Sequence, residues 1–148
     1  MISFPVIDTH VHLLDQKKFT YSWASGAPKL ARDWTLDQLI AAANPYEIEG
    51  AVFVEVDVDH PDHMKEARWV QSLADRDQRI KGCVACLPLE QGKATESEME
   101  ELAALPIARG VRRLIQNQPD PDFVLRKDFI EAVQCLPKYN LSFDLCLY

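Results

Sequence analysis

Short apolar runs alternate with longer amphipathic segments along nearly the whole chain, and this alternation limits the folds that the sequence can adopt. Buried β-strands are predicted where the apolar runs fall, at residues 5–10, 51–56, 82–87, 110–115 and 142–147. Helices are predicted between them, at residues 36–44, 64–75, 96–105 and 128–136. Repeated βα units of this kind build a mainly parallel sheet covered by helices, so the expected fold class is α/β.

A single domain is expected over residues 1–148, because no linker-like segment divides the alternating pattern. The composition, 47% apolar and 26% charged, is typical of a globular domain with a substantial core. Two helix starts support the division into elements, since Thr35 is followed by Gln38 and Thr95 by Glu98. Both pairs have the spacing of a capping box.

The charge of the chain argues against a nucleic-acid partner. Proteins that bind a phosphate backbone usually carry clustered Lys and Arg on one face, whereas this chain has a net charge of -7, so a small molecule is the expected partner. The sequence opens without a basic, apolar leader, and no stretch approaches the roughly 20 apolar residues of a membrane helix. A cytoplasmic protein with no membrane partner is therefore expected.

The four cysteines are expected to be free thiols, because the chain carries no sign of secretion. Cys83 and Cys86 have the spacing of a zinc or redox motif, but they fall within an apolar strand candidate. Residues three apart on a strand point to opposite faces, which suits neither role.

Alternation within the strands predicts a polar interior. In the second strand the valine side, Val52, Val54 and Val56, is expected to meet helices, so Phe53 and Glu55 are expected to face inward. The other polar residues predicted to face inward are Asp8, His10 and His12 in or after the first strand, Arg112 and Gln116 in or after the fourth, and Asp144, Cys146 and Tyr148 in or after the fifth. Burying unpaired polar groups costs several kcal/mol, so a working interior explains this pattern better than an ordinary core.

The motif His10-Val11-His12 is the strongest candidate for chemistry. Its imidazoles lie on one side of a strand end, about 7 Å apart at the backbone, and both can reach one metal ion. In α/β folds, functional groups gather at the carboxyl ends of the strands. Asp8 could accept the second N–H of His10 or could cap the start of the strand. The alternative for the histidines is simple hydrogen bonding in a strand-end loop.

Two other segments allow more than one interpretation. Residues 19–28 form a long aromatic loop, either an active-site lid or a hydrophobic flap over the core. His60 and His63, which follow the second strand, could add metal ligands, although a solvated loop at a helix start is the favoured interpretation.

Residues 7–13, Ile-Asp-Thr-His-Val-His-Leu at the end of the first strand, resemble the opening signature of the amidohydrolase superfamily in its amidohydrolase-2 branch. Five further segments resemble the lactonase-like group within that branch, and they lie at residues 19–23, 50–55, 110–116, 119–123 and 141–145. Together these segments span nearly the whole chain, from residue 7 to residue 145.

The resemblance implies a TIM (β/α)8-barrel type of fold, with about five of the eight βα units present, and a hydrolase that opens lactones of sugar acids or small dicarboxylates. It implies that His10 and His12 are catalytic and bind a divalent metal, most simply zinc, or polarise the lactone carbonyl in a metal-free variant. Arg112 would bind a substrate carboxylate or hydroxyl, or else form an ion pair with Glu55 or Asp144. Weaker candidates for substrate contacts are Gln116, Trp23, Tyr148 and Glu55.

A complete barrel needs eight strands, and five are predicted here. In the resembling family, later strands supply another histidine and an aspartate. The first and fifth strands would be open edges, through which a homo-oligomer could form. A truncated copy of a larger enzyme is the favoured account, ahead of completion by another polypeptide. A non-oxidative decarboxylase of the same branch and a non-catalytic barrel fragment are the alternative functions.

Overall fold

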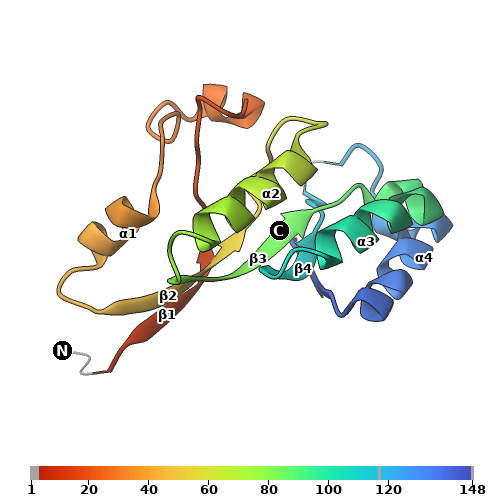
Figure 1. Cartoon of the computed structure of the whole chain (residues 1–148). Helices are drawn as coiled ribbons and strands as arrows, with labels where there is room; N and C mark the ends of the chain where they lie inside the picture. The colour runs from red at the N-terminus through yellow and green to blue at the C-terminus, as the bar shows by residue number, and fades with distance from the viewer. Residues whose placement is uncertain (1–3, 117, 148) are drawn as a thin grey trace.

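The chain forms one sheet of five parallel strands in a computed structural model that describes residues 4–116 and 118–147. The strands follow one another in chain order, and they are β1 (Val6–Val11), β2 (Ile48–Val54), β3 (Ile80–Cys86), β4 (Ala108–Arg112) and β5 (Ser142–Asp144). The sheet curls into half of a barrel (Figure 1). This confirms the predicted α/β class and the order of the βα units.

Helices connect successive strands, as the alternation predicted. They are α1 (Leu36–Ala43), α2 (His63–Ala74), α3 (Glu96–Ala103) and α4 (Lys127–Cys135), with short 3-10 turns at Ser22–Gly26, Leu89–Thr95, Phe123–Leu125 and Leu136–Tyr139. The strand bounds shift by a few residues from the predicted ones. For example, β2 begins at Ile48 rather than at residue 51, and β4 ends at Arg112 rather than at residue 115.

The main core lies between the sheet and the helices. Alternate strand positions contribute to it, among them Val11, Phe53, Cys83, Ala85 and Val111. They pack against apolar side chains of the helices, such as Val70 of α2, Leu102 of α3 and Ala132 of α4. The opposite face of the sheet therefore forms the inside of the curl.

The predicted orientation of the second strand was wrong, because Phe53 faces the helices rather than the interior. Phe53 lies in the helix-side core, with its ring perpendicular to that of Trp69 of α2 at a centroid distance of 6.4 Å. Val52 and Val54 therefore occupy the interior face. In β5, by contrast, Phe143 packs against the helix-side core, which leaves Asp144 on the interior face as predicted. The sequence of β2 does not show which face meets the helices, because both faces of a buried parallel strand are apolar.

The aromatic loop before α1 is a packed flap. Phe19, Tyr21 and Ala24 are buried in a second apolar cluster with Val56 and Val58, which follow β2. Ser22 anchors the loop, because the carboxylate of Asp59 accepts hydrogen bonds from its backbone N–H at 2.8 Å and its hydroxyl at 2.5 Å. Of the two alternatives for this loop, the structure favours the hydrophobic flap.

The first of the two predicted capping boxes is present and the second is not. The Thr35 hydroxyl accepts a hydrogen bond from the Gln38 backbone N–H, and the Gln38 side chain accepts one from the Thr35 backbone N–H. Thr95 is instead buried, and its hydroxyl donates to the carbonyl oxygen of Pro88 at 2.9 Å. Its side chain is therefore used within the loop that precedes α3.

Replacing Thr35 by alanine is expected to lower the free energy of unfolding by about 1 kcal/mol, because the backbone N–H of Gln38 loses its side-chain acceptor. Urea denaturation followed by circular dichroism measures this change. Thr20→Ala is a suitable control, since Thr20 is an exposed threonine outside the helices. Equal losses in the two variants would contradict a capping role for Thr35.

The edges of the sheet carry exposed apolar side chains. β1 and β5 are the outer strands, and Ile7 of β1 and Leu145 and Leu147 after β5 are exposed. Among the helices of the described residues, none has both the length and the apolar character needed to cross a membrane.

Candidate active site

The two histidines lie together at the carboxyl end of β1. His10 is within the strand, His12 directly follows it, and their ring centroids are 5.0 Å apart with the rings nearly perpendicular. Val11 and Leu13 pack into the helix-side core, so the histidines occupy the alternate positions on the inside of the curl. The structure therefore places this pair where parity predicted.

The role expected of Asp8 changes. Its carboxylate accepts a hydrogen bond from the backbone N–H of His10 at 3.1 Å, and this is a contact with the main chain rather than with the imidazole. The pairing of β1 with β2 is irregular between Asp8 and Val11. Asp8 therefore shapes the strand end that carries the histidines.

The orientation of the His12 ring is fixed by a backbone carbonyl. His12 Nδ1 lies 2.9 Å from the carbonyl oxygen of Val54 at the end of β2. A carbonyl oxygen can only accept, so Nδ1 carries the hydrogen and the lone pair is on Nε2. Partial burial lowers the pKa of His12, the hydrogen bond to the Val54 carbonyl opposes this change, and the nearby charges of Arg112 and His10 lower the pKa further. The neutral imidazole that results is the form that ligates a metal.

Glu55 and Arg112 form a buried ion pair across the interior of the curl. Arg112 Nε donates to Glu55 Oε1 at 2.5 Å, and its guanidinium also donates to the Glu55 carbonyl oxygen. Glu55 is 0% exposed and Arg112 is 7% exposed. Of the alternatives for Arg112, the structure shows the ion pair with Glu55. Burial raises the pKa of Glu55, and the adjacent guanidinium opposes that rise.

The remaining predicted substrate contacts are spread along the same edge of the sheet. Trp23 donates its indole N–H to the Val56 carbonyl oxygen at 2.8 Å. Gln116 follows β4, and its side-chain oxygen lies 3.0 Å from the Cys146 sulfur after β5. Tyr148 lies outside the described residues. The fold thus brings Trp23 and Gln116 to the carboxyl ends of the strands but gives each a partner within the protein.

A pocket of about 470 Å³ opens beside Trp23, at the carboxyl ends of β2, β3 and β4. Its lining combines apolar surface with ionisable side chains, which are those of Asp57, Asp59, His60, His63, Cys86, Glu90 and Arg113. Arg113 makes two hydrogen bonds to the Glu90 carboxylate, at 2.9 and 2.7 Å. The guanidinium that lines the pocket is therefore already paired with an acid.

His60 and His63 differ in their surroundings. His60 is exposed, as a solvated loop would have it, and their ring centroids are 5.2 Å apart. His63 is buried at the start of α2, where its Nε2 lies 3.2 Å from Glu98 of α3. The expectation of a solvated loop is therefore wrong for His63.

The cysteines are free thiols, as expected. Cys83 lies in the helix-side core, whereas Cys86 lines the pocket on the other side of the sheet. Burial raises the pKa of both thiols. The opposite facing predicted for this pair is confirmed.

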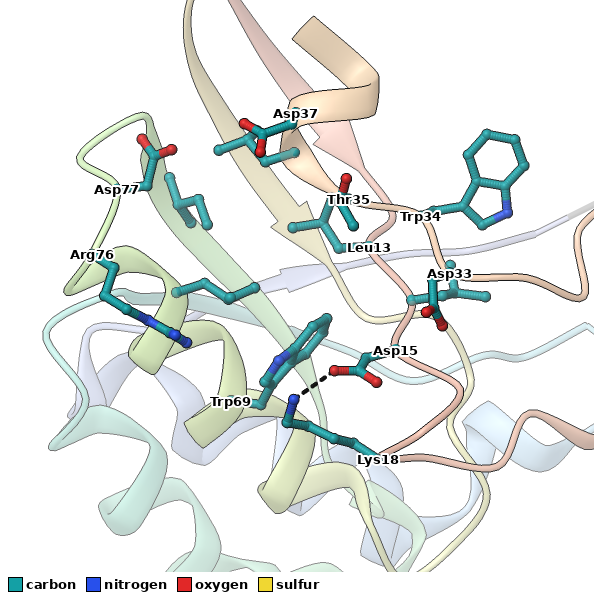
Figure 2. Close-up of a pocket in the computed structure, with 14 residues that line it drawn as sticks. Leu13, Asp15, Lys18, Asp33, Trp34, Thr35, Asp37, Trp69, Arg76 and Asp77 are labelled. Carbon is teal, nitrogen blue, oxygen red and sulfur yellow. Dashed lines mark hydrogen bonds and ion pairs between the residues drawn. The ribbon is translucent and has the colours of Figure 1, made fainter. Parts of the chain in front are cut away.

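Figure 2 shows another pocket, of about 440 Å³, between α1 and α2. Its apolar wall includes Leu13 and Trp69, which belong to or pack against the helix-side core. Asp15 and Lys18 form an ion pair of 2.6 Å at its rim. The pocket thus lies on the outer side of the sheet, away from the interior face that carries His10 and His12.

The donor set fits part of a metal site. His10 and His12 present two imidazoles side by side, and Nε2 of His12 is free of the Val54 contact. Within residues 4–116 and 118–147, no group of three or more His, Cys, Asp or Glu side chains is placed to hold a metal ion. Structural and catalytic zinc sites use three or four protein ligands. The described residues therefore offer two ligands of a set that needs at least one more.

Two features of the site were missed in the sequence. The Val54 carbonyl that orients His12 is a backbone atom, and no residue type signals it. Glu66 of α2 is 1% exposed beside the Glu55 and Arg112 pair. Helical spacing could have revealed it, because Glu66 falls among Met64, Ala67 and Val70 on the buried face of α2.

Comparison with known proteins identifies one family and several solved structures of similar fold. Residues 7–147 match the Amidohydro_2 family, described as Amidohydrolase. The chain is 22% identical over 165 residues to the uncharacterized protein y4mH of Sinorhizobium fredii, covering 100% of this chain and 55% of that protein. An amidohydrolase from Burkholderia multivorans, solved with bound zinc, is 23% identical at a TM-score of 0.77 and covers 96% of this chain and 49% of its own.

A third match is a probable 2-pyrone-4,6-dicarboxylic acid hydrolase from Acinetobacter baumannii, solved with citric acid bound. It is 18% identical at a TM-score of 0.63, over 93% of this chain and 47% of that one. The chain thus spans about half the length of these relatives. The five parallel strands and their helices correspond to about half of a TIM barrel of this kind.

Proposed function

The chain belongs to the amidohydrolase family of the Amidohydro_2 type, and on that premise we propose that it supplies the first half of a hydrolase site that opens a small lactone. His10 and His12 are the proposed metal ligands, with zinc as the proposed ion. A divalent metal held there would make hydroxide available near neutral pH.

The single observation that supports this proposal most is the hydrogen bond between His12 and Val54. Its length of 2.9 Å and its carbonyl acceptor leave Nε2 as the ligating atom. His10 lies beside it at the same strand end, and the zinc-bound relative from Burkholderia multivorans has the same fold. A histidine serving only as a loop contact would need no neighbour of the same type.

The proposed substrate is a small cyclic ester. The pocket of about 470 Å³ beside Trp23 has room for one, and its lining offers donors and acceptors for the oxygens of such a ring. In this proposal Trp23 forms an apolar wall, and Gln116 stands near the carboxyl end of β5. A small-molecule substrate also agrees with the net charge of -7.

The open edges of the half-barrel are proposed to pair with further strands, which would bring the missing ligands. β1 and β5 have free edges within the described sheet, and Ile7, Leu145 and Leu147 are exposed beside them. Unpaired edges with apolar side chains favour association with another strand. Further strands of the same polypeptide are the preferred source.

Zinc binding to the chain, measured by isothermal titration calorimetry, tests the proposed ligands. Wild-type protein is expected to bind one Zn²⁺ ion, and His10→Ala and His12→Ala are each expected to weaken binding at least about tenfold, since each removes one of few ligands. His60→Ala is the matched control, because His60 is also exposed and lies outside the strand-end pair. Unchanged affinity in the His12 variant would contradict the assignment.

The reaction is tested on zinc-loaded protein with a panel of sugar-acid and dicarboxylate lactones. Acid release in a pH-stat that His12→Ala abolishes supports lactone opening. Release of carbon dioxide from an aromatic or unsaturated acid would instead assign the decarboxylase reaction. Wild-type protein that binds no zinc and opens no lactone would contradict the proposal.

A further inference from the structure

One peptide group at the end of β2 connects His12 to the rest of the sheet. The peptide between Val54 and Glu55 accepts the hydrogen bond from His12 through its carbonyl oxygen, at 2.9 Å. The N–H of the same planar group donates to the Val84 carbonyl oxygen of β3, at 2.8 Å. Any rotation of this peptide therefore moves the acceptor that fixes the His12 ring.

Arg112 holds the residue on the carboxyl side of that peptide. It reaches from β4 across β3 to the end of β2, where it donates to both a side-chain oxygen and the carbonyl oxygen of Glu55. Glu55 Oε2 in turn accepts the Asp57 backbone N–H at 2.8 Å. Asp57 has a φ of 54°, a left-handed conformation that is unfavourable for a residue with a side chain. The Glu55 carboxylate thus stabilises a sharp turn that would otherwise be free to relax.

We propose that Arg112 is a positioning residue that orients His12 through Glu55 and the Val54 peptide, rather than a residue that binds substrate. Both hydrogen bonds that the structure shows for its guanidinium go to Glu55, and Arg112 is 7% exposed. A planar fork suits this contact, because it holds two oxygens in a fixed relation that a lysine could not. The network spans the ends of β1, β2, β3 and β4.

The chain contains a matched control for this role. Arg113 and Glu90 form a two-bond ion pair at 2.9 and 2.7 Å, one residue along from Arg112. Glu90 lies after β3, so this pair joins β4 to the Leu89–Thr95 turn and not to the end of β2. Removing this ion pair deletes two hydrogen bonds, as many as Arg112 makes to Glu55, without changing the contacts of the Val54 peptide.

The tautomer of His12 tests the proposal without metal or turnover. Long-range ¹H–¹⁵N NMR on the wild-type chain is expected to show the Nδ1–H form of His12. In the double variant Glu55→Gln/Arg112→Met, which leaves no buried charge unpaired, we expect a substantial population of the Nε2–H form that a free imidazole side chain favours. The control double variant Glu90→Gln/Arg113→Met is expected to keep the wild-type tautomer. Arg112→Lys, which retains the charge, is the second test variant and is expected to behave like the first double variant.

A second readout rests on the proposed function, since it uses His12 as a metal ligand. Replacing a residue that orients a metal ligand typically lowers metal affinity 10-fold to 100-fold. The Zn²⁺ affinity is therefore expected to fall about tenfold in Glu55→Gln/Arg112→Met and to stay within about twofold in the control double variant. If folded Arg112 variants keep the Nδ1–H form, Arg112 is a structural residue only and the inference is wrong. If the wild-type chain binds no zinc, the proposed function fails while the tautomer still decides the inference.

Discussion

Arg112→Met is expected to lower the free energy of unfolding by about 3 to 5 kcal/mol, because it leaves a buried carboxylate without its counter-charge. Glu55 is 0% exposed, and Arg112 Nε lies 2.5 Å from its carboxylate. Water cannot reach Glu55 to replace the guanidinium, so the whole cost of the unpaired charge falls on the folded state. Urea denaturation near pH 7.5 measures the loss.

The double variant Glu55→Gln/Arg112→Met separates the charge from the packing. It is expected to recover most of the stability lost in Arg112→Met, because neutral groups of similar size replace a buried ion pair at little cost. Arg113→Met is the control, since Arg113 and its partner Glu90 are each partly exposed, with side-chain exposures of 20% and 23%. We expect it to lose clearly less, about 1 kcal/mol. A single Arg112 variant as stable as the Arg113 variant would show that Glu55 can be neutralised locally.

Local sequence patterns predicted the elements and the histidine pair well. Each predicted strand and helix is present, and His10 and His12 face the inside of the curl. This succeeded because the histidines lie at the end of a strand whose other face, Val11 and Leu13, is clearly apolar. Period-two alternation then leaves one facing for the pair.

The prediction failed where alternation was extended past a strand end. β2 ends at Val54, and Asp57 turns the chain with a positive φ, so Glu55 no longer follows the alternation that places Phe53. Taking Glu55 as part of the strand reversed the expected facing of Phe53. β4 likewise ends at Arg112, before Gln116. Strand ends depend on the pairing between strands, which local sequence patterns specify least.

The contact that orients His12 was beyond prediction for a different reason. It joins a ring of β1 to a main-chain oxygen of β2, which is 42 residues away. Its existence depends on the register of the two strands and on the turn that follows β2. Any residue at position 54 presents the same carbonyl group, so the identity of Val54 contains no signal for it.

The free energy of unfolding is expected to fall by about 3 kcal/mol between about pH 5.5 and about pH 8 because of Glu66 alone. Burial first, and the Glu55 carboxylate second, raise the pKa of Glu66 from its ordinary value of 4.5 to about 8. In this window the unfolded chain has released the proton that the folded chain still holds. Raising the pH therefore favours the unfolded state, by about 1.4 kcal/mol for each pH unit.

Glu66→Gln is expected to remove this dependence, because glutamine remains neutral at every pH in the window. Oε1 of Glu66 has no hydrogen-bond partner among the described residues, so the amide loses no contact at that atom. Thermal and urea unfolding at several pH values give the stability difference between the variant and wild type, which should grow by about 3 kcal/mol toward high pH. Glu100→Gln, on the exposed side of α3, is the control and should leave the difference flat. Parallel pH profiles for Glu66→Gln and wild type would mean that Glu66 is ionised in the fold, and the buried cluster of Glu55, Glu66 and Arg112 would then carry a net negative charge.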